Sequence, residues 1–273
     1  MENNGEEALS VLTRMKLNLA RSTAQRMRTS NEGAVRTLHD MLEESEKRVE
    51  MGKFMGRVLI GTCIYTFALA ALKGFSNLLG DTTFITVPLL VAFAIGIYLN
   101  IKTSIYPASD YGLTTRNWKP ALKEAMLFSL PVLAVIVLIK WILIQTSVME
   151  GHVIFDFYRS KGTTLPMTLL AFSLYATFAP IQELVARSGM QSSFEMFLTG
   201  KYKTWFSIFL STLLFSSTHL HVSFILAVLV FPLGLFWGWL YSRYPTLVGV
   251  AASHVLIGSF GLFIVGFPTK GAA

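Results

Sequence analysis

Long hydrophobic runs recur along the chain from Met55 onward, with shorter polar segments between them. A helix that crosses the ~30 Å hydrocarbon layer of a membrane needs about 20 apolar residues. Seven windows reach roughly this length, namely residues 56–75, 83–101, 125–147, 166–187, 204–221, 224–242 and 246–267. The chain lacks the alternating ten-residue segments of a membrane β-barrel. The pattern predicts an all-α polytopic membrane protein with about seven transmembrane helices in one bundle.

Residues 1–52 form a separate, polar block with apolar positions at helical spacing. In its second half these positions are Val35, Leu38, Leu42 and Val49. Asn31, in "TSNEG", can cap a helix, so we expect two helices with a break there. Two interpretations stay open: a hairpin for dimerisation, partner docking or membrane-surface contact, and a solvated extension of marginal helicity. Both give a cytoplasmic amphipathic extension at 1–52, followed by the bundle at 53–273.

The polar segments between the windows predict loops and turns. "SIYPASDYGLTTRNWKPALKEA" contains Pro107 and Pro120, two helix breakers, so we expect a cytoplasmic loop between the second and third windows. "TSVMEGHVIFDFYRSKGTTLP" is the matching external loop. The fifth and sixth windows almost touch, which puts a turn near His219 to Val222. Lys140 lies well inside the third window, and we expect its long side chain to snorkel to the interface.

Composition agrees with a membrane protein. Of the 273 residues, 53% are hydrophobic and 14% charged, and the mean hydropathy is +0.54, too apolar for a soluble domain. The start "MENNGEEALS" is acidic and polar, unlike a signal peptide. Cys63 is the single cysteine, which excludes an intrachain disulfide and a multi-cysteine metal site.

The net charge of +7 is unevenly placed. Basic residues gather from Arg14 to Arg57, from Lys102 to Lys123, at Lys201 and Lys203, and at Arg243. All these segments share one side of the membrane if the N-terminus is cytoplasmic, as the positive-inside rule favours. A smaller external group comprises Arg159, Lys161 and Lys270. Anionic headgroups of the bilayer account for this charge, so we expect no nucleic-acid partner.

Few polar side chains lie inside the windows, and they cluster late in the chain. Glu183 and Arg187 are four residues apart, acid first, which is the favourable order for an ion pair on one helix face. Such a pair offsets the ~2.5–3.5 kcal/mol that each charge costs in hydrocarbon. Gln182 points about 100° away from Glu183 on a helix and faces another neighbour. A structural ion pair explains Glu183 and Arg187 without assigning them a reaction.

Two histidines follow on later windows. His219 closes "FSSTH" and His254 follows "GVAAS", and each needs a polar partner at its depth. Each is explained as a packing residue, or both converge with Glu183 on a site for general-base or metal-assisted attack on a carbonyl. His221, two residues after His219, points elsewhere, and we expect it to be a cap or turn residue.

The order of these motifs resembles a known family. "QELVARSGMQ", then "FSSTH", then "GLFWGWLYSRYPTLVGVAASH" are similar to the intramembrane proteases of the CAAX-protease and bacteriocin-processing (CPBP) family. Its signature is a pair of glutamates followed by arginine, then a phenylalanine and histidine, then a histidine and asparagine. The resemblance covers about Leu169 to Phe260. It implies an intramembrane endopeptidase that acts on a membrane-associated protein or peptide.

The resemblance also implies roles for individual residues. The first glutamate and the histidine of the second motif activate a water, and the later histidine and asparagine stabilise the oxyanion. Carried over by position, these roles fall on Gln182, His219, His254 and Gly258, with Glu183, Arg187 and Phe215 at the remaining positions of the signature. The family leaves a divalent metal such as zinc open as a cofactor, without requiring one.

Two positions depart from the signature. The neutral amide of Gln182 cannot take a proton from water as a base, and Gly258 has no side chain that could donate to an oxyanion. Three hypotheses follow: an active endopeptidase with Glu183 or His219 as base, a catalytically silent relative that binds a membrane partner in the old cavity, and a proton or ion path. For all three we expect a multi-pass protein of the bacterial inner membrane, which can dimerise through 1–52.

One geometric condition separates these hypotheses. On the window limits, Gln182 lies near the cytoplasmic end of the fourth window and His219 near the external end of the fifth. The two can meet only if the motif lies deeper in the membrane. We therefore predict a fourth helix that begins near Ala171, bends at Pro180 and continues beyond Arg187.

Overall fold

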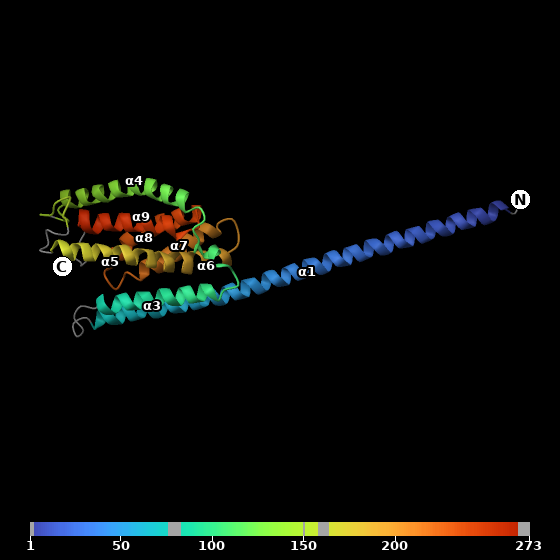
Figure 1. Ribbon diagram of the computed structural model, residues 1–273, viewed down its shortest axis with the longest axis horizontal. Helices are drawn as coiled ribbons and strands as arrows, with labels where there is room; N and C mark the ends of the chain where they lie inside the picture. Colours follow the sequence, from blue (N-terminus) through green and yellow to red (C-terminus); the bar gives the residue numbers. More distant parts are fainter. Residues whose placement is uncertain (1–2, 76–82, 150, 158–163, 267–273) are drawn as a thin grey trace. The chain divides into compact units, whose positions relative to one another are not determined.

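The computed structural model describes residues 3–75, 83–149, 151–157 and 164–266 (Figure 1). These residues form helices joined by turns, and no strand occurs among them. The chain divides into two compact units, residues 1–50 and residues 51–273. The expected external group of Arg159, Lys161 and Lys270 lies outside the described residues.

Six helices of the described chain are long and apolar enough to cross a membrane, so the protein is an integral, multi-pass, all-α membrane protein. The helices in chain order are α1 (Asn3–Gly74), α3 (Thr83–Lys102), α4 (Trp118–Gln145), α5 (Leu165–Glu183), α6 (Ser192–Phe197), α7 (Lys203–Ser217), α8 (Phe224–Arg243) and α9 (Leu247–Ser259). Two π-helical segments, η3 (Leu184–Gln191) and η4 (Phe260–Val265), follow α5 and α9, and a 3-10 turn, η1 (Ala108–Tyr111), precedes α4. With 15 residues, α7 is shorter than the spanning helices.

Two expectations about the boundaries of α1 and α4 are wrong. The predicted break at Asn31 is absent, because α1 continues without interruption through that segment, so a hairpin does not form. Asn and Gly inside a helix cost only about 1 kcal/mol or less relative to Ala, which a long helix tolerates. The predicted loop also ends early, because α4 begins at Trp118 and includes Pro120 in its first turn. Proline is tolerated there, since the first N–H groups of a helix have no intrahelical partner.

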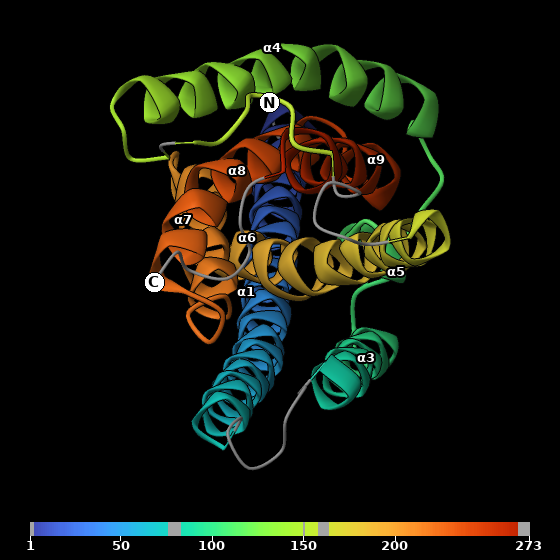
Figure 2. The ribbon, with the colours of Figure 1, turned by 90° about the vertical axis from the view of Figure 1, so that its left-hand side faces the viewer.

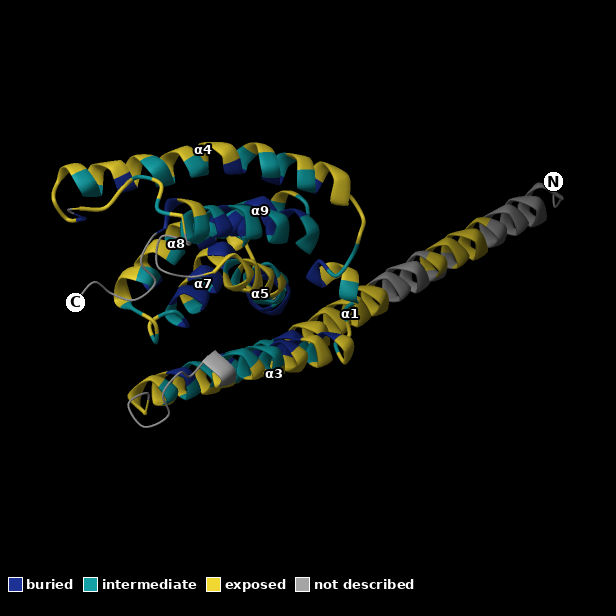
Figure 3. Ribbon diagram, turned by 60° about the vertical axis from the view of Figure 1, so that its left-hand side comes forward, coloured by how far each residue is buried: buried dark blue, intermediate teal, exposed yellow. Residues whose placement is uncertain are grey.

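Within residues 51–273, α9 lies between α4 and α5 (Figure 1). On another side α8 packs against both α9 and α7 (Figure 2). The part of α1 that follows Met51 runs beside α3 (Figure 1). Burial is densest in η3, where seven of the eight residues are buried. Buried residues are also frequent on α9 and in the second half of α8, whereas much of α4 is exposed (Figure 3). These segments therefore form the interior, where polar side chains are shielded from lipid.

Lys140 departs from its expected role. Its side chain does not snorkel but is fully buried, and its Nζ donates a hydrogen bond to the backbone carbonyl of Val265. Val265 is the last residue of η4, whose final carbonyl groups lack helical partners. A cation at this helix end satisfies such a carbonyl and interacts favourably with the helix dipole. Lys140 therefore connects α4 to the end of the segment that follows α9.

Candidate active site

The segment that carries the first motif lies deep in the bundle. α5 ends at Glu183, η3 continues the helical path through Arg187 to Gln191, and α6 extends it to Phe197. The continuation beyond Arg187 is confirmed, although the helix begins at Leu165 rather than near Ala171. Glu183 thus lies close to the middle of a 33-residue apolar stretch, Leu165–Phe197. π-Helical segments are frequent at functional sites, since they change which side chains share a face.

A buried chain of hydrogen bonds starts at Glu183. Arg187 Nε donates to Glu183 Oε2 at 2.8 Å, and both side chains are 0% exposed. Arg187 Nη1 donates to Gln191 Oε1 at 2.9 Å, and Nη2 donates to the Gly234 carbonyl at 3.0 Å. Gln191 Nε2 in turn donates to the Gly238 carbonyl at 2.9 Å. The predicted ion pair is confirmed, and it is anchored to the backbone of α8.

Gly238 on α8 allows this close approach, and Gly234 allows α8 to approach α7. A Cβ atom on Gly238 would lie 2.8 Å from Arg187 Nη1 and 3.1 Å from Gln191 Oε1. A Cβ atom on Gly234 would lie 2.7 Å from Thr212 Cγ2. A larger residue at 238 would push the Arg187 guanidinium away from the Gly234 carbonyl to which it donates, so Gly238 helps to fix where Glu183 is held.

The second oxygen of Glu183 holds a histidine. His254 Nδ1 lies 2.7 Å from Glu183 Oε1. Because the carboxylate paired with Arg187 can only accept hydrogen bonds, His254 Nδ1 carries the proton and donates it. The neutral imidazole then has its lone pair on Nε2. This is the carboxylate–imidazole arrangement that orients a general base in hydrolytic enzymes.

The ring of His254 is fixed from a second direction. Trp237 stacks on it with ring centroids 3.9 Å apart and an interplanar angle of 22°. The indole Nε1 donates to Ser253 Oγ at 3.2 Å, and this hydroxyl forms a 2.7 Å hydrogen bond with Ser129 Oγ. Side chains from α4, α8 and α9 thereby hold the plane in which the imidazole lies.

His219 approaches the same region from the end of α7. Its Nδ1 lies 3.0 Å from the Phe215 carbonyl, which can only accept, so here too Nε2 keeps the lone pair. The Phe215 ring packs edge-on against both imidazoles, with centroid distances of 4.9 Å to His219 and 6.5 Å to His254. His221 lies in the turn between α7 and α8, with Nδ1 2.6 Å from the Thr218 carbonyl, as expected.

The two positions that depart from the family signature lie in different surroundings. Gln182 is half-buried, and among the described residues no hydrogen bond joins it to Glu183, His219 or His254. At Gly258, a Cβ atom would lie 1.6 Å from the hydroxyl oxygen of Tyr175. The space that a side chain at 258 would need is therefore occupied by the Tyr175 hydroxyl, which comes from α5.

Part of the chain matches a known protein family. Residues 162–260 match a family model described as "Rce1-like: Type II CAAX prenyl endopeptidase Rce1-like". This part of the chain is Rce1-like. The predicted resemblance to the CPBP family is thus confirmed over residues 162–260, which resemble a CAAX-type intramembrane protease. Comparisons with curated proteins and with solved structures found no match.

The donor atoms of the Rce1-like region do not fit a catalytic zinc site. Such a site needs three protein ligands, usually histidine, cysteine or a carboxylate. No group of three such residues is placed to hold a metal ion in the part of the chain that the structure describes. Both oxygens of Glu183 are engaged, by Arg187 and by His254.

Several residues around the Rce1-like site were not predicted from the sequence. Gln191 lies four residues after Arg187, so the spacing that predicted the ion pair also extends to it. Tyr175 lies eight residues before Glu183, on the same side of α5 by helical spacing, yet a single tyrosine in an apolar helix carries no signal of its own. Trp237 and Ser253 depend on contacts between α8 and α9, which periodicity does not reveal.

Proposed function

We propose that the protein is an intramembrane endopeptidase in which His254, oriented by Glu183, is the general base. The observation that carries this proposal is the 2.7 Å contact between Glu183 Oε1 and His254 Nδ1. The general base is thus a residue of α9. Proton removal therefore does not require the glutamate that the family signature has at the position of Gln182. In this role Glu183 and Arg187 are positioning residues, because they act on the substrate through His254.

The reaction is a hydrolysis in two steps. His254 Nε2 takes a proton from a water molecule while the water oxygen forms a bond to the peptide carbonyl carbon. The resulting tetrahedral intermediate collapses as the C–N bond breaks, and the imidazolium returns its proton to the leaving nitrogen. The products are a carboxyl group and an amine. The matched family's description, a prenyl endopeptidase, makes a prenylated CAAX-motif peptide the first substrate to test.

Two groups lie against the His254 imidazole where it takes up the proton during this reaction. The Glu183 carboxylate lies on its Nδ1 side, and the Trp237 face stacks on the ring at 3.9 Å. A carboxylate and an aromatic face both stabilise a cation in a site shielded from water. His219, with a lone pair on Nε2, can accept a hydrogen bond from the attacking water. The amide of Gln182 can bind substrate or water without removing a proton.

The proposed setting is the bacterial inner membrane with a cytoplasmic N-terminus, which the basic segments support through the positive-inside rule. The substrate is a membrane-associated protein or peptide that reaches the bundle from the bilayer. Residues 1–52 are proposed to mediate a homodimer. Val35, Leu38, Leu42 and Val49 support this, because they follow helical spacing and are each more than half exposed.

The test is cleavage of a farnesylated CAAX-motif peptide, and of membrane-anchored peptides, by the purified protein in liposomes. We expect His254→Gln to lower turnover by about 10²–10⁴-fold, the usual contribution of a general base. The matched control is His221→Gln, a histidine in a turn outside the site, with turnover close to wild type. Loss of activity in Gln182→Ala equal to that in His254→Gln would contradict the assignment of the base.

The second candidate function is binding without catalysis. The observation that favours it is the amide at Gln182, where the family signature has a carboxylate. It predicts an inactive wild type and activity that appears in Gln182→Glu. The third hypothesis, a proton path, predicts proton flux into liposomes that disappears in His219→Gln or His254→Gln. Neither result agrees with the endopeptidase that we propose.

A further inference from the structure

The hydroxyl of Tyr175 occupies the position where the family signature has a side chain on α9. A Cβ atom on Gly258 would lie 1.6 Å from Tyr175 Oη and 2.4 Å from its Cζ, far inside the ~3.5–4.0 Å at which non-bonded atoms pack. Tyr175 and any larger residue at 258 therefore exclude each other. Glycine at 258 leaves the space that the phenol occupies.

This hydroxyl lies beside the proposed base. The Tyr175 ring meets the His254 ring edge-on, with centroids 6.1 Å apart, and Gly258 is one helical turn after His254. The ring also packs edge-on against Phe263, with centroids 6.3 Å apart, so two aromatic neighbours restrict its direction. Tyr175 is half-buried, and its hydroxyl forms no hydrogen bond with any side chain or backbone group that the structure describes. A polar donor is thus present without an acceptor among the described residues.

We propose that Tyr175 donates a hydrogen bond to the oxyanion, in place of the side chain that Gly258 lacks. This inference rests on the proposed endopeptidase activity. A phenol is a suitable donor, since tyrosine hydroxyl groups serve in oxyanion holes. Here the donor comes from α5, while the signature position that it replaces is on α9. The site thus keeps a donor at this position even though its α9 side chain is missing.

Tyr175→Phe removes only the hydroxyl and keeps the ring that packs on His254 and Phe263. We expect kcat to fall by about 10²–10³-fold, as for loss of one oxyanion donor, with little change in KM. The matched control is Tyr65→Phe, another half-buried tyrosine, which stacks on Phe93 in the α1–α3 pair. Its kcat should equal that of wild type.

A double variant tests whether Tyr175 and a side chain at position 258 compete for the same space. Gly258→Asn alone should lower the melting temperature strongly, because of the 1.6 Å overlap. Tyr175→Ala combined with Gly258→Asn should recover melting temperature and exceed Tyr175→Ala in kcat. An active wild type with unchanged kcat in Tyr175→Phe overturns the role of Tyr175 alone. An inactive wild type overturns the proposed function, and this inference with it.

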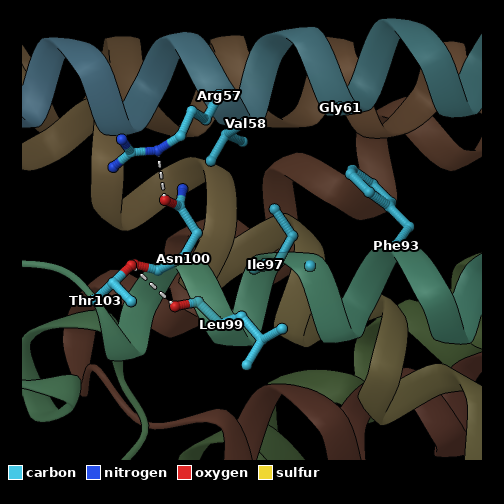
Figure 4. Close-up of a pocket in the computed structure, with 9 residues that line it drawn as sticks. Arg57, Val58, Gly61, Phe93, Ile97, Leu99, Asn100 and Thr103 are labelled. Carbon is cyan, nitrogen blue, oxygen red and sulfur yellow. Dashed lines mark hydrogen bonds between the residues drawn. The ribbon is translucent and has the colours of Figure 1, made fainter.

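A groove between α1 and α3 carries a second, independent inference. It has a volume of about 430 Å³, within the range of ligand pockets. Figure 4 shows Arg57 from α1 and Asn100 from α3 at one end, joined by a 2.7 Å hydrogen bond from Arg57 Nε to Asn100 Oδ1. The two outer nitrogens of the exposed Arg57 guanidinium point away from Asn100 (Figure 4).

The rest of the groove is apolar. Gly61 and Phe93 line its other end, and Gly96 opens into it, since a Cβ atom there would meet nothing within 4 Å. Both helices are candidate membrane spans, so the groove borders the lipid phase. A cationic end joined to an apolar channel is complementary to an anionic headgroup with an acyl chain. Basic residues at the cytoplasmic boundary bind such headgroups.

From this charge pattern we infer that the groove binds one anionic phospholipid, with its phosphate on Arg57 and an acyl chain along Gly96. The test is native mass spectrometry of protein from liposomes of equal phosphatidylglycerol and phosphatidylcholine. Wild type should retain phosphatidylglycerol preferentially, and Arg57→Gln and Gly96→Leu should each retain several-fold less. The matched control is Gly56→Leu, which adds the same side chain to open space outside the groove.

Three outcomes would overturn this second inference. One is equal retention of the two lipids by wild type, which would mean that headgroup charge is not recognised. Another is unchanged phosphatidylglycerol in both Arg57→Gln and Gly96→Leu. The third is displacement of the lipid by inorganic phosphate alone, which would identify a simple anion site without an acyl chain.

Discussion

Removal of Arg187 should strongly destabilise the bundle. Arg187→Met leaves the Glu183 carboxylate buried without its cation, since both side chains are 0% exposed. Breaking a buried ion pair by deleting one partner costs about 3–5 kcal/mol. The variant also removes the donors to Gln191 Oε1 and to the Gly234 carbonyl. Each buried acceptor left unpaired adds about 1–3 kcal/mol if it does not relax.

The free energy of unfolding is measured by titration of mixed micelles with sodium dodecyl sulfate, followed by tryptophan fluorescence. Arg243→Met is the matched control, because Arg243 also pairs with a glutamate, Glu124 at 2.5 Å, but on the exposed boundary of the bundle. Solvent screens that pair, so its loss should be far smaller. A double variant, Glu183→Leu with Arg187→Met, should be more stable than Arg187→Met alone, since no buried charge remains. Equal losses for Arg187→Met and Arg243→Met would refute this reasoning.

Two further predictions concern contacts that hold the site. Gly238→Ala should destabilise the protein by about 1–3 kcal/mol, because its Cβ would lie 2.8 Å from Arg187 Nη1. The same titration measures this loss. Gly56→Ala is the control and should be as stable as wild type, because a Cβ atom at Gly56 meets open space. Lys140→Met should cost about 1–3 kcal/mol, since the Val265 carbonyl loses its donor. A Lys140→Met protein as stable as wild type would mean that this buried ammonium contributes nothing net.

Much of the fold could be predicted from hydrophobic length alone, because lipid leaves a helix little freedom in where it begins and ends. α8 (Phe224–Arg243) and α3 (Thr83–Lys102) agree with the predicted windows within one residue. The boundaries that failed, at Asn31 and at Pro120, involve residues that a helix tolerates in some positions and not in others. Such positions depend on the neighbouring turns, which local composition does not specify.

In the candidate site, too, some contacts could be predicted from the sequence and others could not. The Glu183–Arg187 pair follows from spacing along one helix and could be predicted. The contact between Glu183 and His254 depends on how α5 packs against α9, which the sequence alone does not give. The overlap between Tyr175 and a side chain at position 258 is even harder to predict from the sequence. It depends on one ring filling the space that such a side chain would need. Contacts within one helix were therefore predictable, whereas the contact between Glu183 and His254 was only one of two interpretations that the sequence left open.

The central claim is that His254, and not the residue at position 182, removes the proton from water. The most direct test is the turnover of a farnesylated CAAX-motif peptide in liposomes by His254→Gln and by Gln182→Ala, each relative to wild type. We predict a loss of at least about 10²-fold for His254→Gln, and at most about tenfold for Gln182→Ala, as for one neutral hydrogen bond. Turnover in His254→Gln equal to that of wild type would contradict the account.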